Sequence, residues 1–500
     1  MVSASGTLLG TPRCLSTRTK RAKPGTYMES ASQWIRKWEK CSLSRPLQAS
    51  NELELSIPLP LSPTKMSTPP RFLEELLDHV VDHLHNERGN LENCCLVSKS
   101  WVPRARKHLF STISIRDAGN LQSWKNAFPD PSSSPARYTK TLAIGCPEVV
   151  ATGDAEEGGW LSAFSRVVRL AMYIPSMDRQ VISLVPFHGF SPFIRSLRIH
   201  LTTFPSSPIF NLICSFSPLE NLHVDVRKGL DNPVDNFDGQ QPPVQTQNTP
   251  AFTGSLKFEG IGLWSPLVRP LLSLPSGLHF QSLCLTLIDG KSISLATALV
   301  ERCRSTLESL ELDCVYTRTF ILHCFHPNDL LLSVEESFLG SIDLSKAKNI
   351  KHVSFSVNQN PQWIIPTLRT VTPAHMKFRR ISLDISFHFL DLDDDSVDTM
   401  DSAGFKNVIG KAACRGWSEL DLLLDQLWES HSIRPEVTYT VYPWVDLTRA
   451  GSWVESLLPE VSTRGIVNLI GKQRRRTIQK PRFMMVFDRF LREEWGGRVF

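Results

Sequence analysis

The 500-residue sequence lacks several features that mark whole classes of protein. It contains no run of eighteen apolar residues, so we expect no membrane-spanning helix and no membrane partner. It contains no Asn-x-Ser/Thr sequon, and its eleven cysteines are odd in number and irregularly spaced. These absences disfavour a secreted disulfide scaffold. They predict a reducing location, the cytoplasm or the nucleus, where cysteine serves mostly as a small buried apolar residue.

The chain also lacks a strong excess of either charge. It has 55 basic and 50 acidic side chains, and its net charge is only +5. This balance demands neither a nucleic acid nor a membrane surface as partner. Hydrophobic residues make up 41% of the sequence, which suits a folded chain. Five hundred residues exceed what one compact core usually supports, so we expect a small module followed by a larger one.

Residues 1–66 show little sustained periodicity and end in a Pro-rich stretch, so we expect a disordered basic leader and linker. The first 28 residues contain no acid and five basic side chains: Arg13, Arg18, Lys20, Arg21 and Lys23. This bias is also that of an organelle transit peptide. A third interpretation is an upstream extension of the reading frame, because Met66 stands just before the first well-patterned segment.

A helical module is predicted over residues 67–111. Apolar residues of "RFLEELLDHVVDHLHNE" recur every three or four positions, which predicts an amphipathic helix that stops at Gly89 and Asn90. A short second helix over 91–97 and a third to about Phe110 follow. The third is capped by a serine, Ser98 or Ser100, and contains Pro103 in its first turn. Three short helices bury little apolar area alone, so the module requires a partner or an adjoining domain.

A strand motif of the form apolar-x-x-apolar-x-apolar recurs between residues 112 and 390. Most steps between its central residues are 25 to 29 residues, and two are 34 and 43; the central positions are 113, 142, 170, 197, 222, 256, 283, 310, 353 and 381. The period matches leucine-rich repeats and predicts an α/β solenoid. The alternative is an ordinary α/β sheet with coincidental spacing.

The connections complete the expected architecture. Helices are expected between strands, for example over 207–216 and 295–303, and residues 229–252 form a disordered insert. Residues 391–500 form a C-terminal cap region that begins with an acidic loop and ends with a basic tail. Within it we expect a helix over 418–430 and a strand over 436–442.

The helical module resembles an F-box, of the F-box-like subtype common in large fungal families. The matching residues, in order, are Phe72, Glu75, Leu76, Asp78, Leu84, Cys94, Leu96, Val97, Ser98, Trp101, Leu109 and Phe110. Leu73 stands where the family has Pro, a residue of the partner contact. An F-box followed by leucine-rich repeats is a familiar arrangement in that family.

The resemblance implies binding rather than chemistry. F-box proteins dock on the Skp-type adaptor of a cullin–RING ubiquitin ligase and present substrates with their C-terminal domain. The resemblance therefore implies a substrate receptor with an adaptor, a cullin complex and an unknown protein client as partners. We expect the adaptor interface to contain Phe72, Leu73, Glu75, Leu76, Val80, Leu96, Val97 and Trp101. Leu77, Val81 and Phe110 are expected to pack inside the module or onto the first repeat. The alternative is a repeat scaffold with a degenerate F-box that joins no ligase.

Motifs for metal binding are incomplete. The segment "HVVDH" places His79, Asp82 and His83 like a metalloprotease helix, but no third ligand has a persuasive position. Cys94 and Cys95 are adjacent and form no Cys-x-x-Cys spacing, so we expect core packing.

Motifs for catalysis and cofactor binding are incomplete too. Residues 404–412 resemble a P-loop but have five residues between the glycines instead of four, and residues 391–402 lack the glycine and glutamate of an EF-hand. No Gly-x-Ser-x-Gly elbow occurs. We therefore expect no enzyme activity and no catalytic, cofactor-binding or metal-binding residue.

The basic run "GKQRRRTIQKPR" near the C-terminus has three interpretations: a nuclear import signal, a nucleic-acid patch or a solvated tail. Nucleic acid is the less expected partner, because the run lacks interleaved aromatic residues on which bases would stack.

Overall fold

The computed structural model describes residues 71–145, 160–174, 187, 191–201, 206–216, 218–226, 252–260, 265–275, 277–287, 290–314, 341–357, 361–386, 400–441 and 445–473. The described residues all lie in one compact unit. The basic leader, the insert up to residue 251, residues 391–399 of the acidic loop and the basic tail from Arg474 onward lie outside the described residues. In the described part, no helix is long and apolar enough to cross a membrane.

Three short helices open the described chain, as the sequence predicts: α2 (Arg71–His83), α3 (Arg88–Val97) and α4 (Val102–Leu109). The predicted end of the first helix is wrong. It stops at His83, a 3₁₀ turn η1 (Leu84–Asn86) follows, and Gly89 and Asn90 lie in the first turn of α3. Glu87 makes the break with non-helical dihedral angles, and its carbonyl accepts the backbone N–H of Leu91 at 3.0 Å. The two candidate stop residues therefore help to start the next helix.

The start of α4 also differs from the prediction. Trp101, not a serine, occupies the position before the first helical residue and caps it with no side-chain hydrogen bond. The Ser98 hydroxyl instead lies 2.8 Å from the Ser100 hydroxyl. Pro103 lies in the first turn, as predicted, where its missing N–H leaves no helical hydrogen bond unmade.

The rest of the described chain is an α/β structure with a twelve-stranded sheet. Every strand pairs in parallel with its neighbours, and the strands follow one another in sequence order, as in an α/β solenoid. The strands are β1 (Thr112–Ile115), β2 (Thr141–Ile144), β3 (Arg169–Ile174), β4 (Ser196–Leu201), β5 (Leu219–Val226), β6 (Phe252–Glu259), β7 (His279–Leu287), β8 (Ser309–Cys314), β9 (His352–Val357), β10 (Arg380–Ser386), β11 (Pro435–Val441) and β12 (Asn468–Gln473).

The register of the sheet confirms the repeat spacing. The ten central positions of the sequence motif are paired strand by strand, in one unbroken row: Ile113, Leu142, Leu170, Leu197, Leu222, Leu256, Leu283, Leu310, Val353 and Ile381. The spacing is therefore not coincidental, because each period returns the chain to the same place in the next strand. The row continues into β11 through the pairing of Ile381 with Pro435.

The sheet also runs beyond residue 390, at which the sequence analysis ended the repeats. The expected late strand is β11, and β12 follows it. The sequence of β12, "NLIGKQ", has a single apolar pair and overlaps the basic run, so its pattern does not predict a strand.

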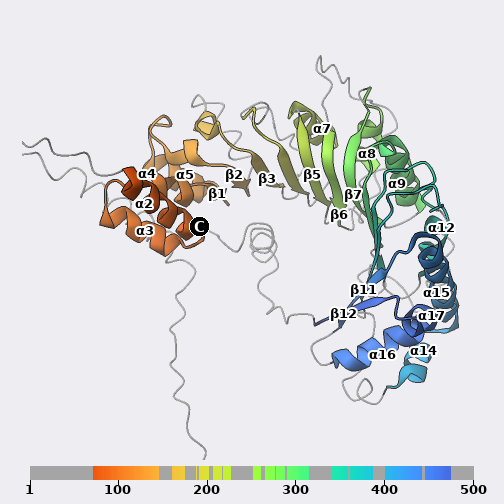
Figure 1. Cartoon of the computed structure of the whole chain (residues 1–500). Coiled ribbons are helices and arrows are strands. Elements are labelled where there is room, and N and C mark those ends of the chain that lie inside the picture. Colours follow the sequence, from red (N-terminus) through yellow and green to blue (C-terminus); the bar gives the residue numbers. More distant parts are fainter. Residues whose placement is uncertain are drawn as a thin grey trace, which may run out of the picture. The chain divides into compact units, whose positions relative to one another are not determined.

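Helices and 3₁₀ turns fill the connections between strands, and Figure 1 shows α7, α8 and α9 along one side of the sheet. The predicted helices over 207–216, 295–303 and 418–430 correspond to α7, α9 and α15. The described helices and 3₁₀ turns of the connections are α5 (Ala118–Ala127), η2 (Pro135–Tyr138), η3 (Trp160–Phe164), α7 (Ser206–Ser215), α8 (Ser265–Leu272), α9 (Gly290–Cys303), η5 (Pro361–Trp363), α12 (Ile365–Leu368), α14 (Ser402–Ile409), α15 (Lys411–His431), α16 (Leu447–Leu457) and α17 (Pro459–Thr463).

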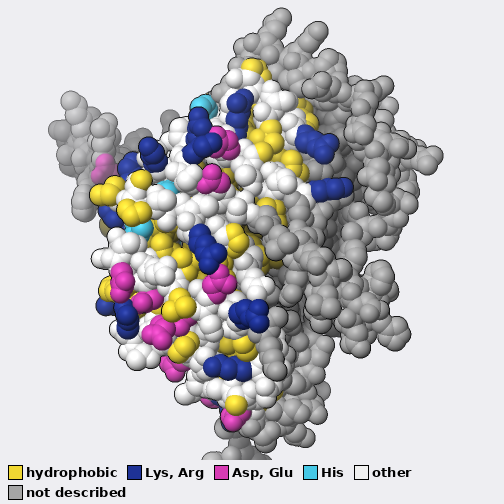
Figure 2. Space-filling view, turned by 90° about the vertical axis from the view of Figure 1, so that its right-hand side faces the viewer, with side chains coloured by type: hydrophobic (Ala, Val, Ile, Leu, Met, Phe, Trp, Pro, Cys, Tyr) yellow, Lys and Arg dark blue, Asp and Glu magenta, His cyan; other side chains and the backbone are white. Residues whose placement is uncertain are grey.

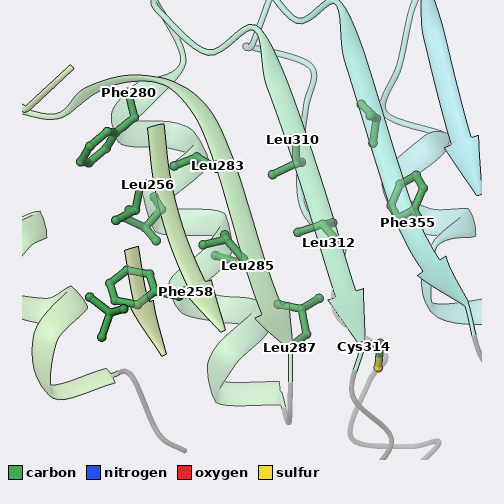
Figure 3. Packing of buried hydrophobic residues seen from close by; sticks show 14 of the residues in the cluster. Leu256, Phe258, Phe280, Leu283, Leu285, Leu287, Leu310, Leu312, Cys314 and Phe355 are labelled. Atoms are coloured by element: carbon green, nitrogen blue, oxygen red, sulfur yellow. The ribbon is translucent and has the colours of Figure 1, made fainter. Parts of the chain in front are cut away.

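The core lies between the sheet and these helices. Leu256, Leu283 and Leu310 lie side by side on successive strands, fully buried, with Leu285 and Leu312 two residues further along their strands (Figure 3). Alternation along a strand explains the motif, because positions four and six of apolar-x-x-apolar-x-apolar face the helices while the intervening residues face away. Each fully buried aliphatic side chain contributes about 1.5–3 kcal/mol to stability.

Shortening one residue of the central row is expected to destabilise the protein strongly. Leu283→Ala removes buried methyl groups and leaves a cavity, so we expect the free energy of unfolding to fall by about 2–5 kcal/mol. Ser282→Ala, on the opposite face of the same strand, is the matched control and should change stability by about 0.5 kcal/mol or less. Urea unfolding followed by circular dichroism measures both. Equal effects of the two substitutions would contradict the assignment of the core face.

Candidate protein-docking surface

The helical module exposes large aliphatic side chains. Leu76 and Val80 on α2 are 51% and 45% exposed, and Leu96 and Val97 at the end of α3 are 66% and 71% exposed. In the described residues, only three other large hydrophobic side chains are classed as exposed: Phe193, Met376 and Leu422. We call Leu76, Val80, Leu96 and Val97 the aliphatic surface of the module. Concentrating so many exposed aliphatic side chains in a few helical turns is typical of a protein-docking site.

The exposed residues occupy defined positions on their helices. Leu76 and Val80 are four residues apart, so they lie on one side of α2, whereas Val81 is buried. Leu91, Cys94 and Cys95 are the buried residues of α3. The module therefore has its own small core, and the aliphatic surface is not part of it.

The other predicted interface residues are less uniformly placed. Glu75 is exposed, and Trp101 is partly buried at the start of α4. The side chains of Phe72 and Leu73 lie outside the described residues, although both belong to α2. Of the residues expected to pack internally, Val81 is buried and Leu77 is partly buried.

Phe110 joins the module to the sheet. Its ring makes edge contacts with Trp124 and Phe128, with ring centres 6.2 and 6.3 Å away. Its carbonyl accepts a hydrogen bond from the Thr139 hydroxyl at 3.0 Å, just before β2. Phe110 therefore packs onto the first repeat, as expected from the sequence.

An ionic cluster that sequence reasoning missed holds α2 against α4. Asp82 of α2 accepts a hydrogen bond from Arg104 Nε at 2.6 Å and lies 2.7 Å from His108 Nε2; Arg104 Nη2 contacts its second carboxylate oxygen. Arg104 Nη1 is also 3.6 Å from the carboxylate of Asp78, one turn earlier. The hydrogen bonds from Arg104, followed by those from His108, hold the pKa of Asp82 well below its usual range. Asp82, which resembled a zinc-site residue in the sequence, is therefore engaged in packing the module.

Metal and phosphate chemistry find no site in the described residues. No group of three His, Cys, Asp or Glu side chains there has the geometry of a metal site, and His79 and His83 are exposed. Cys94 and Cys95 are buried, and burial raises the pKa of Cys95 to about 11, which keeps that thiol unreactive. The P-loop-like stretch lies in α14 and α15, which a single residue, Gly410, separates.

The polar face of the sheet is the second candidate surface. In its first half several polar side chains contact one another: His200 lies 2.9 Å from Asp225, and Glu259 lies 2.7 Å from His223 and 2.6 Å from Lys257. Burial alone would raise the pKa of Glu259, but His223 and then Lys257 lower it to about 2. These pairs satisfy their own charges and leave little for a ligand.

The helical side of the C-terminal half shows no such concentration of one kind of side chain. Figure 2 views the molecule from the right-hand side of Figure 1, where α9, α12 and α15 lie. Among the described residues of this face, basic side chains are spread widely, acidic ones lie mostly toward the lower left with basic ones among them, and apolar side chains occur in small groups. Leu422 of α15 is 56% exposed, without an exposed aliphatic neighbour one helical turn away.

No protein-family model matches this sequence, and a search of the curated proteins finds no match either. The interpretation of the helical module as a protein-docking site therefore depends on its own residues: their order in the sequence and their exposure in the fold.

Replacing Asp82 tests the ionic cluster. Asp82→Asn removes the charge that Arg104 and His108 contact, so we expect a loss of about 0.5–1 kcal/mol at pH 7, since the pair is partly exposed and screened by solvent. Because folding depresses the pKa of Asp82, its contribution is complete above 3.8, the ordinary value, and is lost as the pH falls below it. Thermal unfolding should show a constant difference between the two proteins from pH 7 to about pH 5 and a difference that shrinks from about pH 4 down to pH 2.

The matched control is Glu92→Gln, which removes the partly exposed pair of Glu92 with Arg88 on α3. This change should cost no more than about 0.5 kcal/mol. A difference between Asp82→Asn and the unmodified protein that stays constant down to pH 2 would contradict the ionic origin of the effect.

Proposed function

We propose that this chain is the substrate-recognition subunit of a Skp–cullin–F-box ubiquitin ligase. The helical module docks the Skp-type adaptor, and the sheet with its helices holds a protein client. No residue of the chain performs ubiquitin transfer. The observation that carries the proposal is the aliphatic surface: the four residues Leu76, Val80, Leu96 and Val97 are exposed on the two helices whose sequence resembles an F-box.

The energetics favour a permanent protein partner for this surface. Each aliphatic side chain that a partner removes fully from water contributes about 1.5–3 kcal/mol before the costs of association are subtracted. The aliphatic surface supplies apolar area, and Trp101, partly buried and close to Leu96 and Val97 in the sequence, supplies the aromatic side chain that is typical of a hot spot. A helix pair with exposed aliphatic residues is suited to contact helices of a partner.

The arrangement of the rest of the chain suits a receptor. Phe110 and Thr139 fasten the module to the first repeat, so a partner bound to α2 and α3 is coupled to the sheet rather than tethered through a loose linker. Eight of the twelve parallel strands follow β4, and they offer strand ends and polar side chains on which a client can dock.

Adaptor binding tests the proposal directly. The full chain is co-expressed with a Skp-type adaptor, and co-purification is measured for the unmodified protein and for Leu76→Asp/Leu96→Asp. We expect a stable complex for the former and at least about a hundredfold weaker binding for the latter, because both substitutions place a charge in a desolvated interface. Leu422→Asp is the matched control: its side chain is as exposed as Leu76, and it should leave the complex intact.

Two results would count against the proposal. If the unmodified chain binds no adaptor, the module is not a working F-box. If it binds the adaptor but recovers no cullin, the chain is a repeat scaffold outside the ligase. Proximity labelling under proteasome inhibition then identifies the client.

A further inference from the structure

A hollow of about 520 Å³ opens at the start of the last three strands. It is lined by Arg379, Arg380, Arg434, Glu436, Ile466, Val467 and Asn468. Ile381 pairs with Pro435, and Glu436 pairs with Asn468, so the lining comes from the first residues of β10, β11 and β12 and the residues just before them. The strand ladder thus brings together three segments that are far apart in the sequence.

The hollow concentrates positive charge. Arg380 and Arg434 directly precede the paired residues Ile381 and Pro435, so their backbones lie about 5 Å apart on neighbouring strands. Like charges opposite one another in a sheet are destabilising. Glu436 compensates one of them, since its carboxylate lies 2.5 Å from Arg380 Nη2.

The other two guanidinium groups of the hollow make weaker contacts. Arg379 Nη1 donates to the carbonyl of Phe378 at 3.3 Å, and the guanidinium of Arg434 lies over the ring of Trp428, 5.8 Å from its centre. The lining therefore keeps two positive charges in excess of its one carboxylate. Both arginine side chains are exposed. Among the described residues neither of them forms an ion pair that an arriving anion would have to displace.

The rest of the lining is not ionic. Ile466 is buried and Val467 is partly buried, and Asn468 adds an amide. A guanidinium binds a carboxylate through two parallel hydrogen bonds, and the aliphatic part of the lining favours an apolar side chain next to it. The described lining contains no aromatic ring on which a nucleic-acid base would stack.

We propose that this hollow binds an acidic segment of a partner protein, in which carboxylate side chains flank an aliphatic residue. Arg379 and Arg434 bind the carboxylates, and the aliphatic residue lies on Ile466 and Val467. In the ligase proposed above this segment belongs to the client, and only that last identification rests on the proposed function.

A synthetic acidic peptide tests the site on the full chain. The probe is a fluorescein-labelled heptapeptide of glutamate and leucine, and its partner probe has glutamine in place of every glutamate. Fluorescence anisotropy should show the acidic peptide binding at low salt at least about tenfold more tightly than the glutamine peptide. Its affinity should fall as salt is raised, since exposed charges are screened within about 10 Å at 0.1 M salt.

Charge-reversal variants locate the binding. Arg379→Glu/Arg434→Glu should weaken binding of the acidic peptide about tenfold or more, and Arg379→Gln/Arg434→Gln should weaken it less. Arg269→Glu, which reverses an exposed arginine on α8, should leave it unchanged. Thermal unfolding checks that the double variants fold; removing like charges from neighbouring strands should not lower their midpoints.

Three outcomes would overturn the proposal: equal binding of the two peptides, equal weakening by Arg269→Glu and the double reversal, or complete displacement of the acidic peptide by about 1 mM inorganic phosphate. Adaptor binding by the double-reversal protein separates this site from the proposed function. If peptide binding depends on the two arginines but the unmodified chain binds no adaptor, the acidic-segment site stands and the ligase assignment fails.

Discussion

The rest of the structure depends on one row of aliphatic side chains that crosses the sheet at right angles to its strands. Each strand contributes one residue to the row, from Ile113 on β1 to Ile381 on β10, and each is covered by the neighbouring strands and by the helices that connect them. Parallel strands need long crossover connections, so the row dictates both the helical side of the fold and the length of the repeat. Long connections are tolerated as long as they return to the row. Leu222 still pairs with Leu256, and Leu310 with Val353, across the two longest steps.

The helical module lies outside this row and is held by contacts of its own. Its attachment to the sheet uses aromatic contacts of Phe110 and a hydrogen bond from Thr139. Its internal packing uses Val81 and the buried residues of α3, and the ionic cluster around Asp82 holds α2 on α4. The ionic cluster adds a specific contact between α2 and α4 to this apolar packing. Leu76 and Val80 lie outside these contacts and are exposed.

Local pattern predicted the parts of the fold that depend on alternation. The central row, three of the connecting helices and the three-helix module follow from periodic apolar residues, because periodicity reports which side of an element is buried. The pattern misplaced the end of the first helix, since Gly89 and Asn90 serve equally well in a first turn, and it missed β12, whose apolar residues are too few to alternate.

Side-chain contacts between elements far apart in the sequence leave no periodic pattern from which they could be predicted. The contact of Asp82 with Arg104 and His108 joins two helices, and the hollow joins the starts of three strands. Charged residues on exposed positions carry no period that distinguishes a partner from solvent. Only the register of the ladder reveals that Arg380 and Arg434 are neighbours.

The two proposed surfaces lie at opposite ends of the strand order and differ in chemistry, one being aliphatic and the other basic. The module lies next to β1 at one end of the strand order, and the arginine hollow lies at β10 to β12, at the other end. Residues that precede the central row are held by the ladder at a fixed spacing, yet their side chains are free of the core. Arg379 and Arg434 directly precede β10 and β11, so the sheet fixes where their backbones lie, whereas their side chains are exposed. Binding sites on rigid strand ends lose little conformational entropy when a ligand arrives. Glu436 already compensates the charge of Arg380, so the uncompensated charges that a ligand of opposite sign meets are those of Arg379 and Arg434.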